Sequence, residues 1–215
     1  MPWKKRFDQN DVLDRMMAVF WAQGYHGTAI QDLVNAAGIN RASLYDTFGD
    51  KRATFTACLR RYDQSVRARH LRELRDQLSP RESIKALLRG TAARLTDDHR
   101  ARGCFMTNTA TELAGRDVDM AAIVGDSQRE VERFFHHMIL AAQAEGTIDP
   151  ALDAETTAAH LLAGLLGMLV LVKSRPERHL LETIAESTIA LLGPEPTLDA
   201  GQPQGEPQTA AHTQL

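Results

Sequence analysis

Cysteine is scarce in this chain, which holds only Cys58 and Cys104 among its 215 residues. Two thiols cannot form the disulfide framework of a small secreted fold, and no charged-then-apolar leader stands before a small-residue cleavage site. Long apolar runs are scarce as well. The longest, residues 158–172, is about 15 residues long and contains His160, whereas roughly 20 residues are needed to span a bilayer. We therefore expect a cytoplasmic protein with no membrane partner.

The sequence also lacks the motifs of common active sites and metal sites. It contains no HExxH, no paired CxxC, no GxSxG and no glycine-rich phosphate loop. His136 and His137 are adjacent and diverge on a helix, and no two histidines are four residues apart on one helical face. We therefore expect no enzymatic activity, no catalytic residue, no bound metal and no cofactor.

The two-residue apolar alternation of β-strands is absent, and apolar residues recur instead every three to four positions. Val12, Met16 and Phe20, for example, form one stripe of a helix. The proportions of 43% hydrophobic and 25% charged residues are those of a globular protein. We predict an all-α fold of about nine helices, at about 9–23, 28–36, 40–47, 51–77, 81–96, 103–114, 118–145, 153–174 and 177–192.

Residues that are typical of helix ends stand at the ends of the first predicted helices. Thr28, Asn40 and Asp50 each precede an apolar-periodic run, which predicts that they are N-caps. Gly24 and Gly38 follow such runs, as glycine commonly does where a helix ends.

Residues 37–40 join the second and third predicted helices through a short turn that contains Gly38. This is the layout of a helix-turn-helix. The exposed face of the third helix would present Arg41, Ser43 and Tyr45 to base edges in a major groove, and its N-terminal amides to phosphate. A tight helical hairpin within a bundle would give the same local pattern.

Charge is distributed unevenly along the chain. Residues 1–61 carry nine basic against six acidic residues, although the whole chain has a net charge of −3. A basic start on an acidic body favours an anionic partner at that end, because the local field rather than the total charge governs the approach of a polyanion.

Sixteen positions agree with one known family at once. Over residues 9 to about 60 the chain resembles the N-terminal domain of the TetR/AcrR family of transcriptional regulators, at Gly24, Tyr25, His26, Gly27, Thr28, Ile30, Leu33, Ala36, Ala37, Gly38, Ile39, Ser43, Leu44, Tyr45, Phe48 and Lys51. The resemblance implies a homodimer that binds a palindromic double-stranded DNA operator. It also implies a repressor that a small-molecule effector releases from that operator.

The family pattern, carried over position by position, implies that the residues contacting DNA are Thr28, Gln31, Arg41, Ala42, Ser43, Tyr45 and Lys51. Leu44 and Phe48 are assigned to the core of the domain. The chain departs from the family at Asp46 and Thr47, so a carboxylate lies near the expected DNA surface and would oppose nonspecific binding or accept from a cytosine amine. Lys4, Lys5 and Arg6 resemble a basic arm that grips phosphate, although a solvated terminus explains them nearly as well.

The resemblance and the composition together divide the chain into four parts. We expect a DNA-binding helix-turn-helix domain over 1–50, a long connecting helix over 51–78 and a ligand-binding and dimerisation domain over 79–192. Residues 193–215 hold four of the eight prolines and almost no large apolar residue, which predicts a disordered tail.

The segment 153–174 is apolar nearly all round, and a helix apolar on every face must be buried on every face. One side would pack on its own subunit and the other on a partner, unless the helix is central to a monomeric bundle. The residues expected at the dimer interface are Leu161, Leu165, Leu169, Val172, Leu181 and Ile184.

A ligand pocket in the body is implied by the resemblance and located by the large adaptable apolar residues of the middle helices, with a few polar anchors. The candidates to line it are Phe105, Met106, Asn108, Phe134, His137, Met138 and Met168, and the alternative for most of them is a place in the plain hydrophobic core.

Cys104 offers a second means of regulation. It stands at the expected start of a helix with His99, Arg100 and Arg102 upstream, so the helix dipole and nearby cations would favour the reactive thiolate. The opposing interpretation is a small buried hydrophobe, as Cys58 is expected to be. The alternatives are thus a repressor switched by oxidants or electrophiles at Cys104 and, more distantly, a helical adaptor that does not bind DNA.

Overall fold

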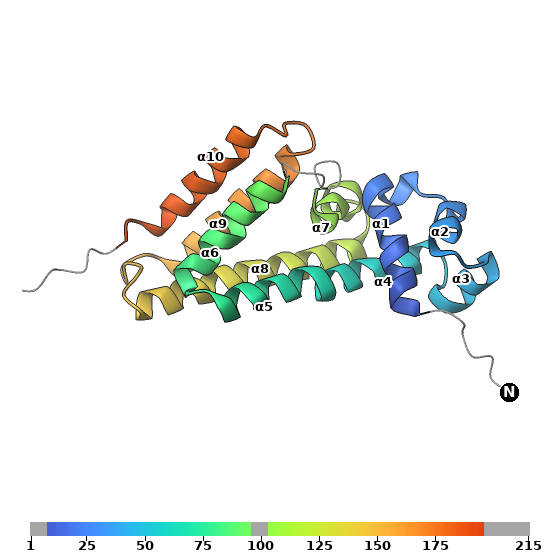
Figure 1. The fold of residues 1–215 in the computed structure, drawn as a ribbon, viewed down its shortest axis with the longest axis horizontal. Coiled ribbons are helices and arrows are strands. Elements are labelled where there is room, and N and C mark those ends of the chain that lie inside the picture. Colours follow the sequence, from blue (N-terminus) through green and yellow to red (C-terminus); the bar gives the residue numbers. More distant parts are fainter. Residues whose placement is uncertain (1–7, 96–102, 196–215) are drawn as a thin grey trace, which may run out of the picture.

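A computed structural model describes residues 8–95 and 103–195, and it is helical throughout with no strand among them (Figure 1). The predicted all-α fold is confirmed. The α-helices are α1 (Gln9–Gly27), α2 (Ile30–Ala37), α3 (Arg41–Phe48), α4 (Lys51–Tyr62), α5 (Ala68–Gln77), α6 (Pro80–Leu95), α7 (Phe105–Thr109), α8 (Val118–Ala144), α9 (Ala154–Leu171) and α10 (Arg178–Ile189). Two π-helical segments, Asp63–Arg67 and Ala110–Ala114, and a short 3₁₀ turn, Ala190–Leu192, complete the list.

The helix from α4 to α5 is continuous, as the predicted span 51–77 requires. The backbone stays right-handed through the π-helical segment Asp63–Arg67 that joins the two labelled halves. A π-helical turn inside an α-helix carries one extra residue, and such turns are frequent at functional sites. This turn lies on the helix that runs from the N-terminal helices α1–α3 into the body, as we call the part of the chain that begins at α6.

Two of the three predicted N-caps are confirmed. The Asn40 side chain accepts a hydrogen bond from the amide of Ser43 at 2.8 Å, and that of Asp50 accepts from the amide of Ala53 at 2.8 Å. The prediction for Thr28 is wrong, because α2 begins one residue later and Ala29 occupies its N-cap.

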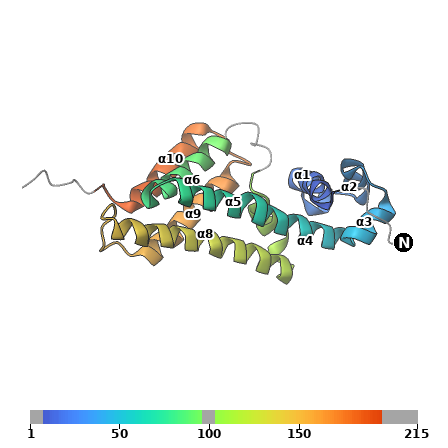
Figure 2. The ribbon, with the colours of Figure 1, turned by 60° about the horizontal axis from the view of Figure 1, so that its bottom comes forward.

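The helices form an elongated molecule in which α4–α5 and α8 run along the length. Helices α1, α2 and α3 gather at one end, whereas α6, α9 and α10 lie together at the other (Figures 1 and 2). Within the described ranges, α9 is long and apolar enough to cross a bilayer by length and composition alone, and apolar core helices of soluble proteins pass the same test. Its residues Leu161, Leu165 and Met168 are buried in the core of the body.

Two hydrophobic cores hold the molecule together. One joins α5, α6, α8, α9 and α10, and the other lies among α1, α2, α3 and α4. The second core also takes Phe105 and Met106 from α7, Leu113 from the following π segment, and Met120 and Val124 from α8. Residues from both sides of the expected boundary at 78 therefore share one core. The four-part division stays a prediction, and most of its tail, residues 196–215, lies outside the described ranges.

A carboxylate from the body caps a turn of the N-terminal domain. Glu112 accepts hydrogen bonds from the amides of Tyr25 at 3.0 Å and His26 at 2.8 Å. This contact is possible because Gly24 interrupts α1 with a φ of +76°, and a Cβ at Gly24 would lie 2.8 Å from the Glu112 Oε2 atom. Glu112 thus connects the body to the chain just before it enters α2.

Candidate nucleic-acid interface

The turn between α2 and α3 is fixed by its own backbone. Gly38 adopts the left-handed conformation, with a φ of +67°, and its amide donates to the carbonyl of Val34 at 3.0 Å. Arg15 adds a bond from Nη1 to the carbonyl of Ala37 at 3.2 Å. A side chain at position 38 would strain this conformation, so the glycine seen in the sequence is needed for the reversal.

Helix α3 has one buried side and one open side. Leu44 is fully buried and Phe48 packs against the same core, as expected. The open side carries Arg41, Ala42, Tyr45 and Asp46, whereas Ser43 is half-buried.

The two largest exposed side chains of α3 lie next to each other. The Arg41 guanidinium carbon is 6.0 Å from the centre of the Tyr45 ring, and Tyr45 is 42% exposed. A planar cation beside a phenolic hydroxyl offers both a fork for guanine or phosphate and a donor for a backbone oxygen.

The remaining predicted contact residues differ in how they are presented. Gln31 is exposed, and its amide nitrogen donates to the Asn35 side chain at 2.9 Å. Lys51 is half-buried, with its ammonium 4.6 Å from the centre of the Tyr25 ring.

Thr28 is a correction to the predicted set of contacts. Its side chain is 2% exposed, and its hydroxyl donates to the carbonyl of Gly24 at 2.6 Å. The hydroxyl closes the turn that ends α1, so it is not presented to a DNA backbone.

Part of the basic excess of the first 61 residues is used within the protein. Arg52 pairs with Asp117 at 2.9 Å and with Asp119 at 2.8 Å, and its hydrogen bond is the main reason that the pKa of Asp117 is lowered. Arg61 pairs with Asp14 at 2.5 Å. Of the cations counted, Arg41 stands on the open side of α3, and the expected arm Lys4, Lys5 and Arg6 lies outside the described residues.

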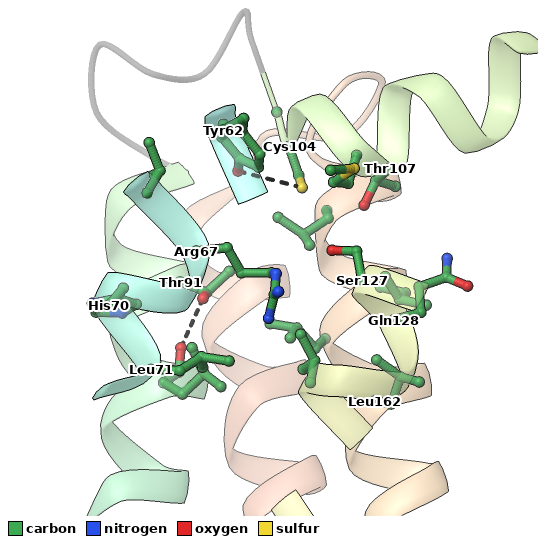
Figure 3. Close-up of a pocket in the computed structure, with 18 of the residues that line it drawn as sticks. Tyr62, Arg67, His70, Leu71, Thr91, Cys104, Thr107, Ser127, Gln128 and Leu162 are labelled. Carbon is green, nitrogen blue, oxygen red and sulfur yellow. Dashed lines mark hydrogen bonds between the residues drawn. The ribbon is translucent and has the colours of Figure 1, made fainter. Parts of the chain in front are cut away.

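A cavity of about 500 Å³ opens in the body beside the junction with the N-terminal domain (Figure 3). Most of its lining side chains are apolar, and they come from α1, α4–α5, α6, α7, α8 and α9. The polar side chains among them include Arg67, His70, Thr91, Arg94, Thr107, Ser127 and Gln128. Its volume lies within the range typical of small-molecule sites.

One of the candidate pocket residues, Met106, lies at this cavity, and most of the others take the alternative place in the core. Phe105, Phe134, Met138 and Met168 are buried in the two cores. His137 is exposed on α8, and Asn108 is half-buried outside the lining. The physical reason is the helical phase of α8, which turns Ser127, Gln128 and Val131 to the cavity and its large residues to the core.

Sequence reasoning missed the lining residues from the first half of the chain. Trp21 and the α4–α5 residues Tyr62, Val66, Arg67 and His70 were not expected there. Tyr62, Val66 and His70 recur every four residues on one face of the long helix, and this spacing is a usable signal.

The residues predicted to face a partner subunit are also corrected in part. Leu161, Leu165, Val172 and Leu181 are buried within the chain's own core, on the side of their helices that packs against α6, α8 and each other. Leu169 and Ile184 are only half-buried, and Leu169 lines the cavity.

The two cysteines have different surroundings. Cys58 is fully buried, its thiol contacts the carbonyl of Leu13 at 3.7 Å, and burial raises its pKa to about 12. Cys104 is half-buried, lines the cavity and lies 3.6 Å from the Tyr62 hydroxyl (Figure 3). It occupies the N-cap of α7, as expected, and His99, Arg100 and Arg102 lie outside the described residues.

We expect native protein to take up one equivalent of iodoacetamide, at Cys104, because the thiolate is the reactive form and Cys58 is both buried and held protonated. Mass spectrometry after brief labelling measures this uptake. Cys104→Ser should abolish the native labelling, and denatured wild-type protein should take up two equivalents. Native labelling of Cys58 at a comparable rate would contradict the assignment.

Helix α3 is capped at its start, follows a glycine turn and is exposed on one side, and the chain also has a helical body with a cavity. This arrangement is typical of a DNA-binding regulator of the helix-turn-helix class. The comparisons with known proteins identify the family. Residues 12–58 match the family model of bacterial regulatory proteins of the tetR family, and residues 80–187 match that of the tetracyclin repressor-like C-terminal domain.

Relatives and solved structures agree with these matches. The chain is 30% identical to the HTH-type regulator YezE of Bacillus subtilis and to the HTH-type repressor ComR of Escherichia coli. It covers 97% and 90% of them, respectively, with 87% of its own length. A cysteine mutant of the TetR family regulator CifR, solved with double-strand operator DNA, is 30% identical with a TM-score of 0.74, over 86% of this chain and 97% of that one. The chain belongs to the TetR family and is a DNA-binding transcriptional regulator, not an enzyme.

Proposed function

We propose that this protein is a homodimeric repressor that binds a palindromic operator through α3 and is released when a small molecule occupies the cavity of the body. The observation that carries the proposal is the open face of α3, which is fixed at its start by Asn40 and at its back by Leu44. Together they hold Arg41 and Tyr45 outward on a rigid element. The likeness to CifR, which was solved with operator DNA, supports the same use of this face.

A single helix-turn-helix reads one half-site, so the proposal requires two copies with recognition helices about one DNA turn or a multiple of it apart. Helix α9 supplies a surface for the second copy. Only 33% of its residues are buried, although it is apolar nearly throughout. Ala163, Gly167 and Val170 follow one another along its uncovered side, and a Cβ placed on Gly167 would meet no atom within 4 Å.

We expect Val170→Glu to raise the dimer dissociation constant by at least about tenfold, because dimer formation would bury an unpaired carboxylate. Size-exclusion chromatography coupled to light scattering measures the dissociation of the dimer. Operator affinity should fall as the dimer weakens. Val118→Glu is the matched control, since Val118 is 82% exposed at the first turn of α8, where an acidic side chain suits the helix dipole. An unchanged dimer in Val170→Glu would contradict the proposed interface.

Release requires that the effector bind more tightly to a conformation unsuited to the operator. The cavity is placed for this, because it is lined by α1, by the long α4–α5 helix and by α7. Each of these also contributes to the core that holds the DNA-binding helices, or continues into a helix that does. A ligand that shifts any of them would change the spacing of the two copies of α3.

A second candidate is a repressor switched through Cys104. The observation in its favour is that Cys104 lines the cavity while Cys58 is fully buried, so a diffusing oxidant or electrophile would meet Cys104 first. Modification would place new volume between Tyr62 and α7, at the same junction that a bound effector would occupy.

A gel-shift titration tests the proposed function. The full chain is titrated on DNA from immediately upstream of its own gene and on a scrambled duplex, at two salt concentrations, with and without a thiol oxidant. Tight, selective and salt-dependent binding is expected, and release by oxidant in wild type but not in Cys104→Ser would favour the second candidate. If the protein does not prefer this DNA, its operator is sought by selection from a random DNA pool. Failure to select any sequence there would contradict DNA binding and favour the helical adaptor. We place the protein in the cytoplasm, where its operator would be.

A further inference from the structure

Two guanidinium groups, those of Arg67 and Arg94, lie among the mostly apolar walls of the cavity of the body. Arg94 is exposed, and its Nη1 and Nη2 atoms lie 3.3 Å from the His70 ring and 3.4 Å from the Thr91 hydroxyl, so the more buried group of the two is Arg67. Arg67 lies in the π-helical segment Asp63–Arg67, and its side chain is only 12% exposed. Figure 3 shows the guanidinium among the lining residues, beside Ser127 and Thr91. What surrounds this group decides which molecules the cavity can hold.

Two carboxylates already offset the charge of Arg67. Asp63 accepts from Nε at 2.5 Å and from Nη2 at 2.9 Å, and Glu130 accepts from Nη2 at 2.5 Å. The hydroxyl of Ser127 donates to Asp63 at 2.7 Å and holds that carboxylate in place. Two carboxylates therefore already pair with this guanidinium, one of them shared with Arg133 at 4.0 Å from Glu130, and a third anion on the same guanidinium would be repelled by both.

The guanidinium nevertheless keeps a donor to spare. Its Nη1 atom is buried and has no hydrogen-bond partner within residues 8–95 and 103–195. A buried donor left unpaired is costly, so an acceptor brought to it gains more than one brought to a solvated group. The neighbouring His70 does not compete for an anion, because burial and the nearby Arg94 lower its pKa and favour the uncharged ring.

We infer that the effector is an uncharged, largely apolar molecule with a carbonyl-type oxygen, which accepts a hydrogen bond from Arg67. This inference rests on the proposed function and names the ligand class of its cavity. The apolar walls bind the hydrocarbon part of the ligand, and the unpaired Nη1 of Arg67 orients it. Because Arg67 belongs to the π-helical turn between α4 and α5, such a ligand would act directly on the helix that leads to the DNA-binding domain.

Three molecules of nearly equal shape separate the possible ligand classes. Methyl naphthyl ketone carries the carbonyl, isopropenylnaphthalene replaces its oxygen by a methylene group, and naphthoate replaces its methyl group by a charged oxygen. Calorimetric titration of the full chain with each should give a ketone affinity about tenfold above that of the hydrocarbon, as expected for one hydrogen bond to a charged donor. Naphthoate should bind more weakly than the ketone.

Substitutions locate the preference. Arg67→Met should bring the ketone and the hydrocarbon to equal affinity, and Arg69→Met, on the exposed side of the same helix, should preserve the tenfold difference. If Arg67→Met does not fold, Arg67→Lys keeps the charge for Asp63 and Glu130 while removing Nη1. The comparison of the three ligands on wild-type protein needs no variant.

Any of three results would overturn the inference. Wild-type protein could bind the ketone and the hydrocarbon equally, or it could bind none of the three molecules. It could also bind naphthoate more tightly than the ketone, which a contact with Arg94 would explain. Operator affinity of the same preparation, measured without ligand, separates this failure from failure of the proposed function. A protein that binds its operator but shows no ketone preference refutes only the ligand class.

Discussion

Arg41→Ala should weaken operator binding by about 1–3 kcal/mol, or roughly 5- to 150-fold, while the dimer stays intact. The side chain stands on the open face of α3 at its first turn, where it can fork onto guanine or pair with phosphate. Its neighbour Tyr45 supports it from one side, with the guanidinium carbon 6.0 Å from the ring centre. Alanine removes the cation without disturbing Leu44, which anchors the helix from behind.

Fluorescence anisotropy on the operator and on single-base variants, at several salt concentrations, distinguishes the two contacts open to Arg41. A base contact predicts relaxed specificity at one position with the salt dependence little changed. A phosphate contact predicts a uniform loss across sequences and a shallower salt slope, by about one unit. Arg69→Ala is the control, because Arg69 is an exposed arginine paired with Glu73, away from α3. Unchanged affinity, or a dimer lost along with binding, would refute the role of Arg41.

The helices and the recognition turn could be predicted from the sequence because their causes are local. Asn40 and Asp50 cap helices through bonds to amides three residues ahead, and Gly38 takes a left-handed conformation that few other residues tolerate. Thr28 shows the limit of such rules. It has the right chemistry for an N-cap, yet Asp32 accepts the Ala29 amide at 2.8 Å and the helix starts one residue later.

The cavity and the interface could not be predicted in the same way, because they depend on which side of each helix meets which neighbour. Periodicity shows that Leu161 and Leu165 lie on an apolar face, but α9 is apolar on nearly all faces, and these two turned out to face their own core. Phe134 and Met138 have the apolar character of cavity residues, and the phase of α8 places them in the core instead. Trp21 and Arg67 reach the cavity from segments far from it in sequence, and a single sequence does not reveal such long-range contacts.

Phe105 packs α7 of the body directly against α1 and α4 of the N-terminal part, a contact that no local signal in the sequence indicates. It was expected in a ligand pocket, yet its ring is 2% exposed and packs edge-on against Phe55 and Tyr62 of α4, with ring centres 5.4 and 5.8 Å apart. Trp21 of α1 stacks on it at 6.2 Å. A residue of the body therefore fills the centre of the core that holds the DNA-binding helices.

Phe105→Ala should reduce the free energy of unfolding by about 3–5 kcal/mol, because it removes a large buried ring and leaves a cavity among aromatic neighbours that cannot close it. Chemical denaturation followed by circular dichroism measures the loss, and Phe105→Leu should lose clearly less. Val118→Ala, at an exposed site, should stay within about 0.5 kcal/mol of wild type. A loss below about 1 kcal/mol for Phe105→Ala would mean that α7 contributes little to the core that holds the DNA-binding helices. Phe105 follows Cys104 at the cavity wall, so a confirmed loss would mean that the wall of the cavity and the DNA-binding helices depend on the same packed core.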